Sequence, residues 1–338
     1  MKSRFQLVFP LLLTLCACRG QQRGEQRVKA AAAGEPLQAK AATAQTPLPL
    51  QIPRVRLLAP EGVERWEPSG AAVIGDHLWI ANDRGGYLAR YPLPLPESGT
   101  ISPTKAFALR LPIKNRIKWE GLEAQADGSL LILEAISRSI WRCPSPETGC
   151  PTLEPVDLSR IQSKIDALPP APFKYVMLES VFLNSDTEVM VGTRGYTPKR
   201  GPAEPLAAFF SQGGEGPLFK HPEGLREGGR RYGMSGATAD AESLWTTWSS
   251  EREDSVRSRD LFGLIAHSTA QGPSWSAPQV CHRFQAKPEG ITRWRDQLIV
   301  VFDEDLDRKG GMIPSDRFPL AANEDYVWSG PARCAGTR

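Results

Sequence analysis

PEGITRWRDQLIVVFDED, residues 288–305, joins a short alternating segment to a run of aliphatic and β-branched residues through a polar turn that contains Asp296. Four other stretches repeat this order: a small or acidic residue, Gly or Ser, alternating apolar positions, a polar turn with Asp, and a strand. They are EPSGAAVIGDHLWIANDRGGYLARY from residue 67, WEGLEAQADGSLLILEAISRSIWRC from residue 119, LESVFLNSDTEVMVGTRGY from residue 178 and MSGATADAESLWTTWSSE from residue 234. The sequence therefore predicts the same β-hairpin five times.

The spacing of these hairpins indicates the architecture. Their Gly or Ser anchors stand at positions 70, 121, 180, 236 and 290, so successive hairpins are 51, 59, 56 and 54 residues apart. A period near fifty residues is typical of a propeller blade of four antiparallel strands. We therefore expect an all-β fold, a β-propeller of five or six blades, in which a sixth blade would come from residues 195–230 or from the two chain ends. A β-sandwich is the alternative, but sandwiches seldom repeat a glutamate-glycine pair at regular intervals.

Two further segments complete the expected fold. Residues 157–168 place apolar side chains at helical spacing behind a capping Asp157 or Ser159, which predicts a short helical insertion between strands. Residues 54–59 alternate like a strand, and we expect them to pair into the last blade beside residues 326–328, which would remove an exposed edge.

The N-terminal residues have the order of a secretory signal peptide, with two basic residues, an apolar run that ends at Leu15, and small residues. That run is too short to span a bilayer comfortably. The motif LCAC at residues 15–18 resembles the bacterial lipobox, whose last cysteine is acylated. The resemblance makes Cys18 the candidate lipidation site; Cys16 and an ordinary secretory leader are the alternatives.

Composition separates a tether from the folded domain. Residues 18–52 are rich in Ala, Gln, Gly and Pro and contain too few apolar side chains to offset chain entropy, so we predict a signal peptide at 1–17, a flexible tether at 18–52 and the propeller domain at 53–338. The chain holds 41 basic and 38 acidic residues; seven and two of them lie in residues 1–40, which leaves 34 and 36. The near-neutral domain lacks the basic surface expected of a nucleic-acid-binding protein.

Four cysteines remain in the predicted domain, and export would place them in an oxidising compartment where disulfides persist. Pro and Gly turn signals between Cys143 and Cys150 favour a local disulfide, which leaves Cys281 and Cys334 to join the last part of the chain to its C-terminus. Zinc binding is the competing interpretation, but the sequence has no CxxC pair and its histidines are scattered.

The motifs EPSG, WEGL and PEGI, followed by Asp turns and apolar strands, resemble a loose set of exported bacterial propellers. These are the SdiA-regulated family, the esterase-like phytase family and uncharacterised relatives in which a PEG[LI] repeat ends in VVxDxD. The resemblance covers residues 54–305, and the third repeat departs from it because Ser180 replaces the glycine. It implies the fold more than the function, because these families share blade motifs while their activities differ.

Three of the five positions before the anchors are glutamates, Glu120, Glu179 and Glu289. Equivalent positions of successive blades converge on the propeller axis, where three carboxylates would repel each other unless they are compensated. The compensation could be a divalent cation such as calcium, basic side chains, or backbone N–H donors. Residues just after the strands of the first and last repeats could contribute further oxygen atoms: Asn82, Asp83, Asp303, Glu304 and Asp305. The resemblance to exported propellers of the phytase type implies calcium at the axis.

Basic residues also follow the predicted strands. Arg84 and Arg194 stand shortly after the first and third, and Arg194 precedes a glycine that would let a ligand approach the backbone. We predict that Arg84, Arg194, Asp303 and Glu304 bind a ligand, since guanidinium groups can hold a phosphate or carboxylate through two hydrogen bonds. Neutralisation of the glutamates is the alternative role of the arginines.

These observations predict a lipid-anchored β-propeller on the membrane of a bacterial cell envelope that binds a small molecule or an envelope protein. The alternative is a calcium-dependent hydrolase of a phosphoester or lactone, with Glu120, Glu179 and Glu289 as calcium ligands. The sequence contains no GxSxG, HExxH or GxxxxGK[ST] motif, so other hydrolase and nucleotide-binding classes have no support.

Overall fold

The computed structural model describes residues 48–83, 85–110, 117–166, 178–184, 188–194, 207–211, 217–221, 225–227, 230–250, 262–271, 274–303 and 323–334. All of these belong to one compact unit, Pro47–Arg338. Within them, the strands form five separate sheets, accompanied by one α-helix, α1 (Ser159–Asp166), and one 3₁₀ turn (Pro146–Thr148).

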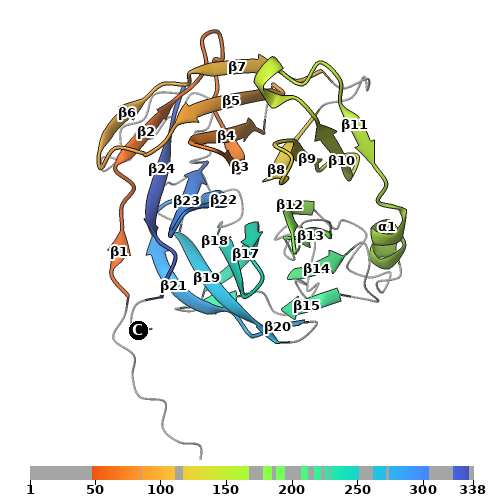
Figure 1. Ribbon diagram of the computed structural model, residues 1–338. Coiled ribbons are helices and arrows are strands. Elements are labelled where there is room, and N and C mark those ends of the chain that lie inside the picture. Colours follow the sequence, from red (N-terminus) through yellow and green to blue (C-terminus); the bar gives the residue numbers. More distant parts are fainter. Residues whose placement is uncertain are drawn as a thin grey trace, which may run out of the picture. The chain divides into compact units, whose positions relative to one another are not determined.

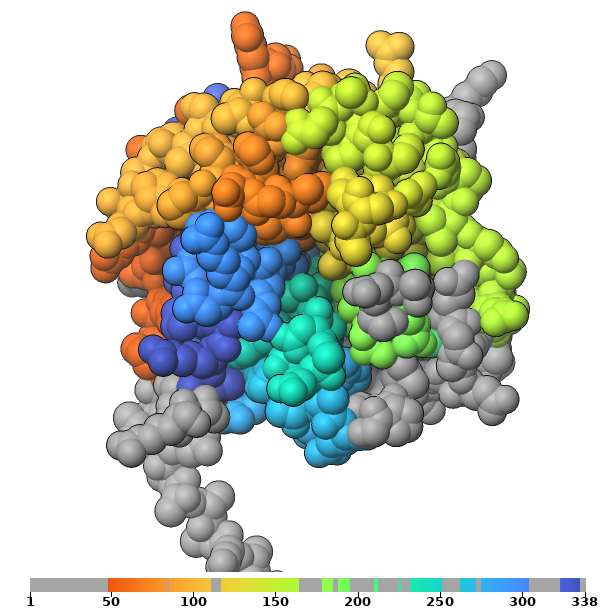
Figure 2. All heavy atoms as spheres, viewed as in Figure 1, coloured from red at the N-terminus to blue at the C-terminus, as the bar shows by residue number. Residues whose placement is uncertain are grey.

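Each sheet is one blade of a β-propeller, and the blades follow one another in chain order around a ring (Figures 1 and 2). From the inner to the outer strand, the first three blades are β3 (Pro68–Ile74), β4 (His77–Asn82), β5 (Tyr87–Pro92) and β7 (Lys105–Ala108); β8 (Trp119–Ala124), β9 (Leu130–Glu134), β10 (Ser139–Cys143) and β11 (Glu154–Val156); and β12 (Leu178–Leu183), β13 (Val189–Thr193), β14 (Ala207–Ser211) and β15 (Pro217–His221).

The last two blades are completed by strands from the N-terminal part of the domain. The fourth blade is β17 (Arg230–Ala239), β18 (Ser243–Ser250), β19 (Phe262–Gln271) and β21 (Gln279–Phe284), extended by β16 (Leu225–Glu227), β20 (Ser274–Trp275) and β1 (Leu50–Gln51). The fifth blade is β22 (Pro288–Trp294), β23 (Gln297–Phe302), β24 (Glu324–Pro331) and β2 (Val55–Leu58), extended by β6 (Gly99–Ile101).

The five predicted hairpins are the five inner pairs of strands, and the blade count is five. Residues 207–221 supply the outer strands of the third blade, so the described part of residues 195–230 makes no sixth blade. Arg226 pairs with Arg231 in a short β16–β17 ladder, so these residues belong to the fourth blade.

The inner strands close the ring by packing against each other in the order β3, β8, β12, β17, β22 and back to β3. Each of the five apolar clusters lies between two adjacent blades; for example, Ile80 of the first blade packs with Ile299 and Val301 of the fifth. Blades are thus buried on both faces, which explains why strands such as LLIL (residues 130–133) and LIVV (residues 298–301) are continuously apolar.

The repeated anchor glycines are required by this close packing of inner strands. A Cβ atom added at Gly70, Gly121, Gly236 or Gly290 would lie 2.7, 2.9, 2.3 or 2.8 Å from a backbone atom of the neighbouring blade. These distances are shorter than van der Waals contact, so only glycine lets the backbones approach so closely. The third blade carries Ser180 at this position, and its hydroxyl is buried with no hydrogen-bond partner.

The predicted ring closure is confirmed. Residues 55–58 (β2) pair antiparallel with residues 324–327 of β24, and β1 pairs parallel with β21 in the fourth blade. The disulfide between Cys281 and Cys334 joins β21 to the chain that follows β24, and the predicted Cys143–Cys150 disulfide is also present. Chain-end strands and one disulfide therefore connect the last two blades.

The predicted helical insertion is present as α1, between the second and third blades. The Asp157 carboxylate accepts a hydrogen bond of 2.9 Å from the Ser159 N–H at its start. Leu158 and Ile161 are buried in the cluster between those two blades. Residues 167–168 of the predicted segment lie outside the described residues.

Candidate functional site

Every inner strand is irregular at the same place, directly before its anchor. The register against the second strand shifts across Ser69, Glu120, Glu179, Ser235 and Glu289, so that each of these residues stands in a β-bulge. A bulge leaves one residue outside the regular ladder and changes the direction of its side chain. The repeat therefore presents five equivalent side chains around the ring.

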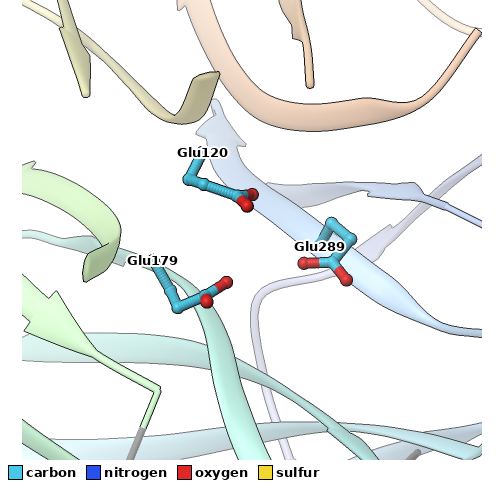
Figure 3. A group of neighbouring side chains, drawn as sticks. All are labelled: Glu120, Glu179 and Glu289. Carbon is cyan, nitrogen blue, oxygen red and sulfur yellow. The ribbon is translucent and has the colours of Figure 1, made fainter. Parts of the chain in front are cut away.

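The three glutamates among them converge. Figure 3 shows Glu120, Glu179 and Glu289 directed toward one another from β8, β12 and β22. One carboxylate oxygen of each lies within 4.8 Å of the others. All three residues are buried, with exposed fractions of 3%, 0% and 3%. We call these three residues the glutamate cluster.

The two serines bind backbone instead of converging on the cluster. Ser69 donates a hydrogen bond of 2.5 Å to the carbonyl oxygen of Trp119, and Ser235 donates one of 2.6 Å to the carbonyl oxygen of Pro288. Both bonds cross from one blade to the next. Serine at a bulge position thus forms a hydrogen bond between blades, whereas glutamate at this position places a carboxylate in the cluster.

A basic side chain accompanies each glutamate of the cluster. Lys118 contacts Glu120, Arg194 Nη1 lies 3.3 Å from Glu179 Oε2, and Lys287 Nζ lies 2.9 Å from Glu289 Oε1. The two lysines also reach a second carboxylate, at 3.6 Å from Asp83 and 3.4 Å from Asp303. Basic side chains, one of the predicted forms of compensation, are therefore present.

The compensation is incomplete at the oxygen atoms themselves. The Oε1 atoms of Glu120, Glu179 and Glu289 are buried and accept no hydrogen bond among the described residues. Those of Glu120 and Glu289 have an ion-pair contact with Lys118 and Lys287, whereas Glu179 meets Arg194 only through Oε2. Within the described residues, no backbone N–H donates to the cluster, in contrast to the backbone-donor alternative. Unpartnered buried carboxylate oxygens are costly, so this arrangement favours an additional cation or proton.

The protonation of Glu289 reflects this cost. The pKa of Glu289 is raised to about 8, chiefly by burial and also by nearby Glu179 and Asp303, while Lys287 and Arg194 oppose the increase. Desolvation disfavours the charged carboxylate when no sufficient counter-charge is present. Without a bound cation, the Glu289 carboxyl therefore holds a proton over much of the neutral range.

The charges around the cluster sum to a simple value. The carboxylates are Glu120, Glu179, Glu289, Asp83 and Asp303, and the cations are Lys118, Arg194 and Lys287. When all are ionised, these described residues carry five negative and three positive charges, a net charge of −2. One divalent cation would neutralise them.

The predicted site residues fall into three groups. Glu120, Glu179 and Glu289 meet, while Arg194 and Asp303 lie beside them and pair with Glu179 and Lys287. Arg84 and Glu304 lie outside the described residues. Sequence reasoning missed Lys118 and Lys287, although the pattern Lys-x-Glu at residues 118–120 and 287–289 was visible.

Comparison with known proteins identifies the fold alone. No family model and no curated protein sequence matches this chain. Among solved structures, an exo-β-1,3-galactanase from Clostridium thermocellum superposes with a TM-score of 0.51 at 10% identity, over 83% of this chain and 62% of that chain. Glutaminyl cyclase of Myxococcus xanthus gives a TM-score of 0.40 at 9% identity, over 83% and 100% of the chains. Virginiamycin B lyase of Staphylococcus aureus gives 0.37 at 10% identity, over 80% and 97%.

Proposed function

We propose that this protein is a lipid-anchored, exported β-propeller that acts as a binding module, and that a calcium ion held by the glutamate cluster stabilises the centre of its ring. The observation that carries the proposal is the convergence of three buried carboxylates, of which Glu179 keeps an oxygen atom with no hydrogen bond or ion pair among the described residues. Hard cations such as calcium bind carboxylate oxygens. When all the surrounding groups are ionised, their net charge equals the charge that one such ion would neutralise.

The size of the cluster favours calcium over magnesium. Three points no farther than 4.8 Å apart lie within about 2.8 Å of a common point, since 4.8 Å divided by √3 is 2.8 Å. Calcium binds oxygens at roughly 2.3–2.6 Å and magnesium at roughly 2.0–2.1 Å. Calcium would require an inward movement of a few tenths of an ångström, whereas magnesium would require a larger one in a tightly packed region.

The lysines need not obstruct the ion. Lys118 would give up its contact with Glu120 and keep Asp83, and Lys287 would give up Glu289 and keep Asp303. Each ammonium group would then still have a carboxylate partner, so ion binding would leave no buried positive charge uncompensated. The Lys118 side chain is 27% exposed and can also turn toward solvent.

Burial weighs against the hydrolase that we considered as an alternative. A phosphoester or lactone would have to reach carboxylates that are at most 3% exposed. A single ion needs far less space. The geometry therefore supports an ion that stabilises the ring, while ligand binding would use more exposed surfaces of the propeller.

Thermal unfolding of the chelated protein tests the calcium site. We expect calcium at 100 times its Kd to stabilise the domain by about 2.7 kcal/mol, and magnesium to have a much smaller effect. Glu179→Gln should abolish the calcium effect, because it removes a carboxylate from the cluster. Glu123→Gln is the matched control, since it removes another glutamate of inner strand β8 that lies outside the cluster.

A chelated protein whose Tm is unchanged by calcium would contradict the proposal and leave Lys118, Arg194 and Lys287 as the only compensation. Equal loss of the calcium effect in Glu179→Gln and Glu123→Gln would also contradict it. No helix among the described residues has the length and apolar character to cross a bilayer. Acylation at Cys18 would attach the protein to a membrane.

A further inference from the structure

A second site lies where the chain passes from β1 in the fourth blade to β2 in the fifth (Figure 1). A half-open cavity of about 680 Å³ lies beside this crossing. Its apolar lining includes Leu50 and Ile52 from the crossing, Leu95 from the segment between β5 and β6, and Trp294 and Trp328 from the fifth blade, and polar side chains such as Gln51 and Gln297 also line it. This volume is within the range of ligand-binding pockets.

The rim of the cavity collects most of the exposed large apolar surface in the described residues. Three large apolar side chains are strongly exposed there, Leu50 at 46%, Ile52 at 49% and Ile136 at 50%, and the first two belong to the rim. Trp294 and Trp328 are half-buried beside them. Clustered apolar exposure of this kind marks an interaction surface, whereas a single exposed residue such as Ile136 needs no explanation.

The charges at the rim are few and balanced. Arg54 and Glu97 line the cavity and are exposed, and Arg295, which stacks on Trp294 at 4.3 Å, is paired with Asp76. The exposed apolar side chains of Leu50 and Ile52, and not a net charge, are therefore what this rim offers to a partner. Trp side chains combine an apolar ring with a polar N–H group and suit the boundary between lipid and water.

The position of the rim in the chain indicates the partner. The described residues begin at Leu48, two residues before the rim, and the chain from Cys18 to Leu48 has 30 steps between successive residues. A flexible chain of this length spans about 30 Å on average, roughly 5–6 Å multiplied by √30. A bilayer that held Cys18 would therefore be near this rim at high effective concentration, and even weak apolar contact would orient the domain.

We propose that the rim formed by Leu50, Ile52, Trp294 and Trp328 docks on the surface of a phospholipid bilayer. The proposal rests on the lipid-anchored state proposed above. The docking proposal adds a defined contact surface, through which the folded domain itself binds the membrane.

Vesicle sedimentation of the isolated domain, residues 47–338, tests this proposal without the anchor. This part contains every described strand, all five apolar clusters and both disulfides in one compact unit, so it can fold alone. We expect it to partition onto vesicles of phosphatidylethanolamine and phosphatidylglycerol in a 3:1 ratio. The double substitution Leu50→Ser and Ile52→Ser should lower the partition coefficient at least tenfold, and Ile136→Ser, an equally exposed residue in the turn after β9, should leave it unchanged.

Brominated lipids provide a second measurement. They should quench tryptophan fluorescence in the wild-type domain, and Trp294→Phe should reduce that quenching. Partition should change little between 0.1 and 0.5 M salt. Absence of partition, equal loss in Ile136→Ser, or adsorption that salt abolishes would overturn the proposal. A fluorescence change with a proline-rich peptide such as PLPLPLP, without vesicle binding, would assign the surface to a protein partner and would also overturn it.

The outcome is independent of the calcium site and of acylation. Mass spectrometry of the membrane-bound full-length protein reports whether Cys18 carries lipid, and chelation reports on the glutamate cluster. Vesicle binding by the domain together with an unmodified Cys18 would support the docking surface and contradict the lipid anchor. No vesicle binding together with an acylated Cys18 would support the lipid anchor and contradict the docking surface.

Discussion

The inner strands begin at buried bulges and end at exposed turns, and both ends carry ion pairs. At the bulges, the side chains of the glutamate cluster and their basic partners Arg194 and Lys287 are nearly removed from solvent. At the turns, Arg293 pairs with Asp240 and Arg295 with Asp76, and these side chains are 38–67% exposed. Similar charge pairs thus occur in different surroundings on the same strands. Exposed pairs contribute little, whereas burial makes the protonation of a carboxylate depend strongly on its few neighbouring charges.

The largest effect should come from disrupting the close backbone packing between neighbouring inner strands, beside the buried bulges. A Cβ atom in Gly236→Ala would lie 2.3 Å from the carbonyl oxygen of Glu289, so the fourth and fifth blades would have to separate. We expect a loss of about 3 kcal/mol or more in the free energy of unfolding, measured with urea. Ser180→Gly is the control, because that blade already accommodates a side chain; it should change stability by about 0.5 kcal/mol or less. Equal stability of wild type and Gly236→Ala would show that the inner strands are not tightly packed.

The next effect is the pH dependence of the metal-free protein. The pKa of Glu289 is raised to about 8 from 4.5, so between pH 5 and 8 the folded protein binds a proton that the unfolded chain has lost. Stability must therefore fall as the pH rises through this window, with a slope of up to about 1.4 kcal/mol per pH unit. Glu289→Gln should flatten this dependence, measured by urea unfolding at several pH values.

Glu123 provides a comparison within the same protein. Burial raises its pKa to about 8 as well, but Glu123 lies nearer the turn of the hairpin and outside the glutamate cluster. It remains partly exposed, so its contribution to the slope should be smaller than that of Glu289. Calcium should remove the part of the slope that comes from Glu289, because the ion keeps that carboxylate charged, and should leave the part from Glu123. A slope that calcium does not change would place the ion elsewhere.

The parts of the fold that the sequence predicts are those that repeat. The inner hairpins were predicted because the anchor glycine is needed wherever two inner strands pack backbone to backbone, and this need recurs in four of the five blades. The blade count stayed open because the outer strands, such as β14 and β15, share no common sequence pattern from blade to blade. The two disulfides were predicted because turn residues bring Cys143 close to Cys150 and because two cysteines then remain.

The site was predicted less completely, for a geometric reason. The glutamates were found because they occupy one position of the repeat, but the bulge that turns them inward depends on register and has no residue signature. Lys118 stands two residues before Glu120, and Lys287 stands two residues before Glu289. In a regular strand, the two members of each pair would lie on the same face, and nothing in that pattern indicates a contact with a second carboxylate. Only the folded ring brings them within reach of a second carboxylate, at Asp83 and Asp303.

The smallest effect is expected at the exposed end of the inner strands. Arg295→Ala removes the contact with Asp76, whose two side chains are 66% and 67% exposed. Solvent screens this pair, so the free energy of unfolding should change by about 0.5 kcal/mol or less. A double-mutant cycle of Arg295→Ala and Asp76→Ala should give a coupling energy that 0.5 M salt removes.

The same cycle on Arg194→Ala and Glu179→Ala should give a larger coupling energy that salt reduces only slightly, because water and ions do not reach a fully buried carboxylate. If the two couplings were equal, burial would not be what distinguishes the two ends of the strands, and the case for an ion at the glutamate cluster would lose its physical basis.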